Sequence, residues 1–197
     1  MVAMEKEIRD SNSNSFNKRV FIGLEMDQVK EELTDIQNQL RPYTEKGKFI
    51  SKDNLHLTLQ FIGEIKDSDL QPLKEMITAS AETIEPFYLT FDHLGQFTKK
   101  KRQVIWTGIE NNPTLFDLYT RLQQTFQENQ RLKIKKTAFL PHITIGRKML
   151  LTAPIKEIEP KLSWPKVNTV EVTKVVLYES KQINETLRYL PIFEQLL

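Results

Sequence analysis

Two short segments of the chain each place a histidine two residues before a threonine. The segment HLTL begins at His56, and the segment HITI begins at His142. In both segments apolar residues alternate with the His and the Thr, which predicts a β-strand that carries His and Thr on one face. The opposite face would pack on the core, so each polar pair would stand on a rigid support.

Two such strands suit acid–base chemistry. An unperturbed imidazole titrates near pH 6.5, so at neutral pH one histidine can accept a proton while a protonated neighbour donates one. If the two polar faces meet across a cleft, the hydroxyls of Thr58 and Thr144 can donate hydrogen bonds to an anion held between them. A phosphodiester fits this arrangement. The base would activate water or a ribose hydroxyl, and the acid would protonate the departing ribose oxygen, with no need of a metal.

The plain alternative is that these histidines are ordinary strand residues. The chain has three histidines, and two of them occur in matching contexts, which favours the functional interpretation. His93 lies in LTFDHLGQF and lacks the pattern, so it is interpreted as a strand-end or rim residue. A catalytic metal site usually has three protein ligands, and threonine is a poor ligand for transition metals. No metal and no cofactor are therefore expected.

Helices and strands that could position these residues follow from the periodicity of the apolar residues. One helix is expected to have Asp27 as its N-cap and to end near Pro42, and two more are expected over about 68–83 and 113–129. The order of helices and strands predicts an α+β fold with largely antiparallel sheets. Residues 1–16 form a polar, Ser- and Asn-rich segment, expected to be a disordered tail before a domain over 17–197. Strands are expected over 18–24, 53–64, 87–97, 103–109, 141–147, 169–180 and 186–196.

Composition sets broad limits on the function. The chain has 197 residues, of which 39% are hydrophobic and 27% charged, as in ordinary soluble domains. The net charge of +2 is too small to indicate nucleic-acid binding by itself, although the run TKKKR (98–102) is either a solvated loop or a hold on a polyanion. Cysteine is absent, so disulfides and thiolate chemistry are excluded. With no membrane-length apolar run and no signal peptide, a cytoplasmic location is expected. The protein is also expected to be a monomer.

The paired motifs HLTL and HITI resemble the HxTx signature of the two-histidine phosphoesterases. More narrowly, the chain is similar to the bacterial and archaeal RNA 2′,3′-cyclic phosphodiesterases, which are 2′-5′ RNA ligase-like proteins. The resemblance covers most of residues 18–193. It includes the segments RVFIGL, DNLHLTLQFIGE, VIWTGI, FLPHITIGR and VVLYES.

This resemblance implies a bilobal α+β fold. Two antiparallel-rich sheets with outer helices would be related by a pseudo-twofold axis, and the active-site cleft would lie between the lobes. It also implies metal-independent hydrolysis of RNA 2′,3′-cyclic phosphate ends to 2′-phosphates, with His56 as proton donor and His142 as proton acceptor. RNA ends or nucleotide cyclic phosphates are the implied substrates.

Two other functions remain open at this point. One is another activity of the superfamily, either a 2′-5′ phosphodiesterase or a reversible 2′-5′ RNA ligase. The other is a non-catalytic RNA-binding module on the same scaffold. Intact His and Thr in both motifs count against the binding module, because binding alone needs neither imidazole.

Arg147 occupies a position where members of the family often carry an arginine, three residues after Thr144. A guanidinium there could pair with phosphate oxygens. Strict alternation would point it away from His142, so a bulge or strand end at Gly146 is needed to bring it to substrate. Without one, Arg147 would be a structural or rim charge.

Three aromatic residues near the motifs are assigned to packing. Phe61 belongs to the apolar face of its strand and is expected in the core. Trp106 and Tyr178 are expected to be core or strand-face residues rather than platforms for base stacking.

Overall fold

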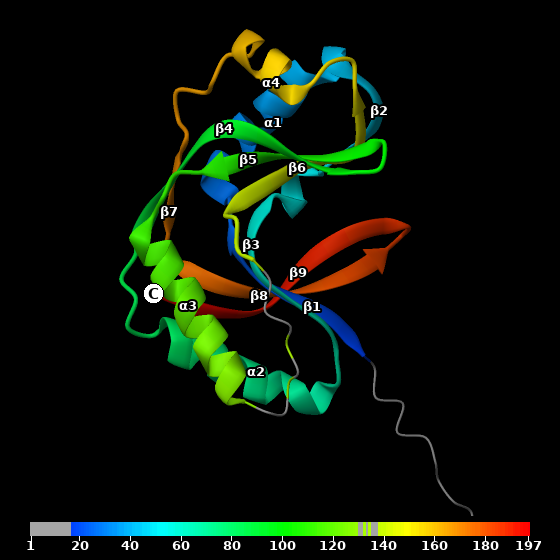
Figure 1. Cartoon of the computed structure of the whole chain (residues 1–197). Helices are drawn as coiled ribbons and strands as arrows, with labels where there is room; N and C mark the ends of the chain where they lie inside the picture. The colour runs from blue at the N-terminus through cyan, green and yellow to red at the C-terminus, as the bar shows by residue number, and fades with distance from the viewer. Residues whose placement is uncertain (1–16, 130–131, 133, 135–137) are drawn as a thin grey trace, which may run out of the picture.

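The computed structural model describes residues 17–129, 132, 134 and 138–197, and it has the predicted α+β fold (Figure 1). The predicted tail, residues 1–16, lies outside the described residues. The helices are α1 (Lys30–Leu40), α2 (Asp67–Ala81), α3 (Pro113–Glu128) and α4 (Ile155–Ile158). The strands are β1 (Lys18–Glu25), β2 (Thr44–Phe49), β3 (His56–Ile65), β4 (Phe87–Lys99), β5 (Arg102–Ile109), β6 (His142–Leu151), β7 (Thr169–Val172), β8 (Lys174–Ile183) and β9 (Thr186–Leu196).

The strands form one curled antiparallel sheet with two halves. Its order is β7-β4-β5-β6-β3-β1-β8-β9, and β2 pairs with the far part of β6. Each half supplies four strands of this order, and the halves meet where β3 lies beside β6. The two predicted sheets are therefore joined, and the lobes of the molecule are the two halves of one sheet. In Figure 1 one half, with β4, β5 and β6, lies above the half with β1, β8 and β9.

Helices cover both halves. α1 and α4 contact strands of the upper half in Figure 1, and α2 and α3 pack on each other beneath the lower half. α3 begins as its sequence predicts: the Asn112 side chain accepts a hydrogen bond from Leu115 N at 2.9 Å, and Pro113 occupies the first turn. The predicted N-cap at Asp27 is wrong. Asp27 begins a 3₁₀ turn, and the α-helix starts only at Lys30.

The single strand expected over 169–180 is wrong: it is divided into β7 and β8, which lie in different halves of the sheet. Two other elements were not predicted. β2 has the sequence TEKGKF, which is polar and lacks alternation because the strand lies at an edge and is largely exposed. α4 is a short turn of helix within the excursion between β6 and β7. Neither carries a strong apolar pattern, so neither could be recognised from periodicity.

The apolar faces of both motif strands anchor the site to the core. Leu57, Ile143 and Ile145 are fully buried, and Leu59 is nearly so. They belong to one hydrophobic cluster that runs through both halves of the sheet. No helix in the described part of the chain is long and apolar enough to cross a membrane.

Candidate active site

The two halves of the sheet meet at a single pair of opposed residues. Leu57 of β3 lies opposite Ile143 of β6 in an antiparallel arrangement, and both side chains are fully buried on the core face. The residues on either side of each member therefore point to the opposite face. A local twofold axis through this pair exchanges the two strands.

The register places all four motif residues in one compact array. The structure pairs Leu57 with Ile143, and by antiparallel geometry the next residues on either side place His56 toward Thr144 and Thr58 toward His142. The twofold axis exchanges the two histidines with each other and the two threonines with each other. Convergence of the two motifs, predicted from the sequence, is thus a property of the sheet register.

A cleft of about 580 Å³ opens over three members of this array, Thr58, His142 and Thr144. His56 does not line the cleft itself: it is 8% exposed and borders an adjoining hollow of about 140 Å³. Tyr189 lines both spaces and lies at their boundary. Residues that line the main cleft include Phe21, Thr58, Phe61, His142, Thr144, Arg147, Ser180 and Tyr189.

Hydrogen bonds fix the tautomer of His56. Its Nδ1 lies 2.7 Å from the carbonyl oxygen of Asn54, which can only accept, so Nδ1 carries the proton. Nε2 of the neutral ring is then an acceptor, and it lies 2.9 Å from Oγ1 of Thr58. The Thr58 hydroxyl donates to it.

The Nδ1 atom of His142 is held in the same way. It donates to the carbonyl oxygen of Leu140 at 2.6 Å, again two residues earlier in the chain. Both imidazoles are therefore held by their own backbone with Nε2 as the atom left for chemistry. The two motifs thus share the hydrogen bond that holds Nδ1 as well as their sequence pattern.

Burial lowers the pKa of both histidines. The pKa of His56 falls to about 4, chiefly through desolvation, with the positive charges of Arg147 and His142 adding to the effect against the Asn54 carbonyl. The pKa of His142 is also lowered, first by desolvation and then by Arg147, against the Leu140 carbonyl. Both rings are thus neutral at pH 7 in the free protein, which differs from the mixed protonation state expected from the sequence. An anion bound between them would raise both pKa values.

A β-bulge turns Arg147 into the cleft. Ile105 and Trp106 are consecutive on β5 but lie opposite Gly146 and Thr144, so β6 carries one extra residue here. The extra residue shifts the alternation, and Arg147 lines the cleft together with Thr144. The sequence analysis expected Arg147 to reach the cleft only if the strand had a bulge or an end at Gly146, and the structure has a bulge there.

A second bulge overturns the prediction for Phe61. Ile22 and Gly23 are consecutive on β1 but lie opposite Gln60 and Thr58, so β3 also carries an extra residue. Beyond it Gln60 takes the core position, at 2% exposed, and Phe61 is 63% exposed on the cleft side. The expectation that Phe61 lies in the core is wrong, because it assumed unbroken alternation.

Aromatic rings surround His56. The ring centroid of Phe21 lies 4.8 Å from that of the imidazole, and Tyr189 meets it edge-on at 5.0 Å. Tyr178 lies 6.1 Å away, stacks on Phe21 and is 9% exposed, which agrees with its predicted packing role. These rings exclude water from His56 and so account for its strong desolvation.

Aromatic rings from the other half of the sheet also surround His142. Phe97 meets it edge-on at 5.1 Å, and Trp106 lies 5.7 Å away. Trp106 is 7% exposed, again as a packing residue. Sequence reasoning did not identify Phe21, Phe97 and Tyr189 as neighbours of the histidines, because they come from strands far away in the chain.

His93 lies on the same row of the sheet as His142. Gly108 is opposite His142 on one side and opposite His93 on the other. The His93 ring covers the glycine, where a Cβ would lie 2.0 Å from Cε1. Its Nδ1 is 2.5 Å from Oδ1 of Asp92, and about half of its side chain is exposed, as expected for a rim residue.

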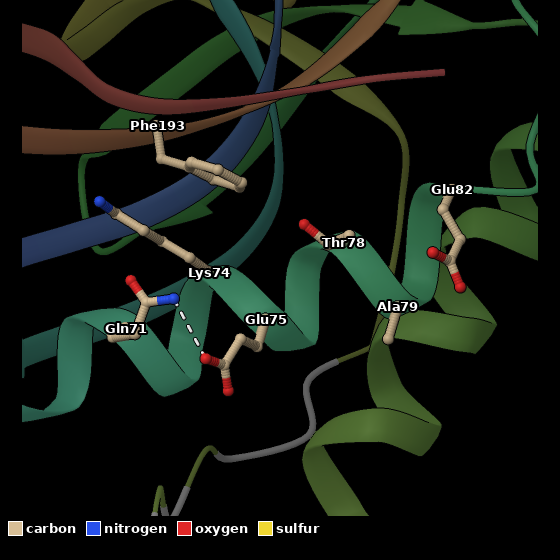
Figure 2. Close-up of a pocket in the computed structure, with 7 residues that line it drawn as sticks. All are labelled: Gln71, Lys74, Glu75, Thr78, Ala79, Glu82 and Phe193. Atoms are coloured by element: carbon tan, nitrogen blue, oxygen red, sulfur yellow. Dashed lines mark hydrogen bonds between the residues drawn. The ribbon is translucent and has the colours of Figure 1, made fainter.

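Two further observations delimit the site. Across the described ranges, no three His, Asp or Glu side chains lie close enough to form a metal-binding group. A separate groove of about 430 Å³ lies between α2 and Phe193 of β9, and Figure 2 shows Lys74 rising from α2 on the side of Phe193. Lys74 Nζ lies 5.7 Å from the centroid of the Phe193 ring. Neither histidine motif borders that groove.

The fold and the paired motifs define a two-histidine phosphoesterase-like protein, and comparison with known families agrees. Residues 20–184 match the family described as the 2′-5′ RNA ligase superfamily. The chain belongs to this superfamily.

Named relatives and solved structures are similar along most of the chain. The RNA 2′,3′-cyclic phosphodiesterase of Thermotoga maritima is 27% identical over 82% of this chain and 86% of its own length. The Escherichia coli protein of the same name is 30% identical, over 75% of this chain and 78% of its own. The crystal structure of E. coli LigT complexed with 3′-AMP superposes with a TM-score of 0.74 at 25% identity, covering 92% of this chain and 99% of that one.

Proposed function

We propose that the protein hydrolyses RNA 2′,3′-cyclic phosphate ends to 2′-phosphates by acid–base catalysis with two histidines. The observation that carries this proposal is the symmetric pair of His-x-Thr units, each with Nδ1 bonded to its own backbone and Nε2 left for proton transfer. The names of the relatives, including those from T. maritima and E. coli, support this substrate.

In this reaction water attacks the phosphorus while His142 Nε2 takes its proton. The bond from phosphorus to the 3′ oxygen breaks, and His56 supplies a proton to that oxygen, which leaves a 2′-phosphate. Assigning His142 as the base agrees with its place in the wall of the cleft. His56 must be protonated before each turnover, and the negative charge of the bound phosphate favours that form.

Three other side chains would hold the phosphate. The hydroxyls of Thr58 and Thr144 would donate to its non-bridging oxygens, and the Arg147 guanidinium would add a charge-assisted hydrogen bond. Thr58 already donates to His56 Nε2, so substrate would draw that hydroxyl away and free the nitrogen. Binding would thereby prepare the acid.

The test is cleavage of a short RNA that ends in a 2′,3′-cyclic phosphate, with chromatographic separation of the 2′- and 3′-phosphate products. We expect the 2′-phosphate and an unchanged rate in excess chelator. His56→Ala and His142→Ala should each lower kcat by a factor on the order of 10²–10⁴. Near-normal turnover by either variant would refute the two-histidine mechanism.

The same assay separates the alternatives. Addition of an RNA with a 5′-hydroxyl end would reveal a ligated 2′-5′ product if joining is the activity. A binding module would retain RNA without converting it. Thr58→Val and Thr144→Val serve as matched variants that keep both imidazoles, and they should weaken turnover less than loss of either histidine.

A further inference from the structure

One charged surface next to the cleft has no part in the proposed reaction. It consists of Lys48, Lys99, Lys100, Lys101, Arg102 and Lys148, and we call it the basic ridge. The tip of the β4–β5 hairpin supplies four of these residues, β6 supplies one and β2 supplies one. Figure 1 shows this hairpin and β2 at the same end of the upper half.

The ridge crosses four neighbouring strands, β4, β5, β6 and β2. β6 pairs with β5 on one side and β2 on the other. Arg102 Nη1 donates to the carbonyl oxygen of Lys148 at 3.1 Å, which ties the hairpin to β6. Lys48 lies opposite Arg147, the cleft arginine.

A hollow joins the ridge to the cleft. Lys48 and Arg147 line the same space of about 200 Å³, together with Tyr189. Arg147 and Tyr189 also line the main cleft. A chain that leaves the cleft past Arg147 therefore reaches Lys48 without crossing another element.

The positive charges of the ridge are not neutralised by the protein. All six side chains are exposed, and among the residues that the structure describes none of the six forms an ion pair. β5 and β6 contain no acidic residue, and β2 contains only Glu45. Such a local excess of one sign attracts a polyanion.

The hairpin on the other side of the cleft has no such excess. In β8 and β9, Lys181 lies opposite Arg188, but Arg188 is paired with Asp53 at 2.9 Å. Glu179 and Glu185 supply negative charge to the same hairpin. The charge asymmetry therefore selects one exit from the cleft.

We propose that the basic ridge binds the backbone phosphates of the RNA strand that leads to the cyclic end, an inference that rests on the proposed function. Along β5 the distance from Ile105, at the level of the cleft, to Arg102 is about 10 Å. With one phosphate charge per about 3.4 Å along a nucleic-acid strand, this length can contact on the order of three phosphates. The protein then acts on ends of RNA chains in preference to free nucleoside cyclic phosphates.

The test removes charge from the hairpin tip and measures RNA binding directly. The variant is Lys99→Gln with Lys100→Asn and Lys101→Gln; asparagine suits position 100 because φ there is 58°. The probe is a fluorescein-labelled single-stranded RNA with a 3′-phosphate, followed by anisotropy between about 50 and 200 mM salt. We expect affinity at low salt to fall on the order of tenfold and the slope of log K against log salt to shrink by about 2.

A matched control removes three exposed lysines elsewhere. Lys66→Gln with Lys156→Gln and Lys166→Gln makes the same change in net charge away from the ridge. It should keep the wild-type slope. Equal losses in both variants would mean a net-charge effect and overturn the proposal, as would wild-type binding by the hairpin variant.

Two further measurements separate this proposal from the proposed function. The hairpin variant should keep the wild-type kcat/KM for a nucleoside 2′,3′-cyclic phosphate while losing about tenfold for the RNA. If the wild-type protein hydrolyses neither substrate, the proposed function fails. The anisotropy measurement then still tests whether the basic ridge binds RNA. Equal affinity for polyglutamate of the same charge would overturn the assignment of the ridge to RNA.

Discussion

His56 is a buried titratable group in a wall of aromatic rings, so its chemistry is tied to folding. Its pKa is about 4 in the folded protein and near 6.5 in an unfolded chain. Between these values the unfolded chain binds a proton that the folded protein does not. Stability contributed by neutral burial is therefore full above pH 6.5, declines toward pH 4 and falls no further below it.

We predict that this linkage removes about 3 kcal/mol of unfolding free energy between pH 6.5 and 4. Urea unfolding of wild type and His56→Gln at several pH values measures it, since the variant should lose that part of the slope. Ile77→Val is the control, because a core truncation should lower the unfolding free energy by a similar amount at every pH. Parallel curves for wild type and His56→Gln would contradict the lowered pKa.

At the scale of single strands, bulges decide which side chains reach the cleft. The bulge in β3 exchanges the expected places of Gln60 and Phe61, and Gln123 Nε2 donates to Gln60 Oε1 at 2.8 Å within the core. Gln60→Ala should thus lower the unfolding free energy by about 1–3 kcal/mol, because it removes the oxygen that accepts the hydrogen bond from Gln123 Nε2. Phe61→Ala should change the unfolding free energy by no more than about 0.5 kcal/mol.

Denaturant unfolding of these two variants tests the bulge directly. Unbroken alternation predicts the reverse ranking, with Phe61→Ala the more damaging change. A larger loss in Phe61→Ala would place the aromatic ring in the core after all. Phe61→Leu keeps an apolar surface there and provides a milder comparison.

Gly95 leaves room for the Trp106 ring, which packs against His142. A Cβ on Gly95 would lie 2.1 Å from that ring. Gly95→Ala should cost about 1–3 kcal/mol through overpacking and lower kcat by displacing that ring. Tryptophan fluorescence should report the displacement, and wild-type emission together with wild-type kcat would contradict it.

The strands show how far the sequence alone reaches. Alternation correctly predicted β3 and β6 and the buried faces of Leu57 and Ile143, because a period of two is dictated by the pleat. It failed at Phe61, since an extra residue in a strand changes no composition and leaves no local pattern. The need for a bulge at Arg147 was recognised only because phosphate binding conflicted with strict alternation, which would point its side chain away from His142.

Non-local contacts were the other limit. Nothing in the sequence connects Phe97 or Tyr189 with the histidines, because sheet order depends on how whole elements pack. β2 was missed for a similar reason: its pairing with β6 gives it strand structure despite a polar sequence. Motifs were therefore predictable, whereas their surroundings were not.

At the scale of the whole molecule, two halves with one motif each are joined at a single residue pair. Leu57→Ala and Ile143→Ala should each cost about 2–5 kcal/mol as buried truncations. Because a twofold axis relates the two positions, we also expect similar reductions of kcat, measured well below the unfolding temperature. Ile77→Val, in α2, should leave kcat unchanged, and a large difference between the two junction variants would argue against the symmetric site.

The backbone hydrogen bonds of the two imidazoles have a consequence for successive turnovers. Since Nδ1 of each ring is held by its own carbonyl, protons enter and leave only at Nε2. After one proposed reaction His142 holds an extra proton and His56 lacks one, so a proton must leave His142 and another must reach His56 before the next turnover. Departure of product and entry of water would then clear the site and also carry protons away from Nε2 of His142 and to Nε2 of His56.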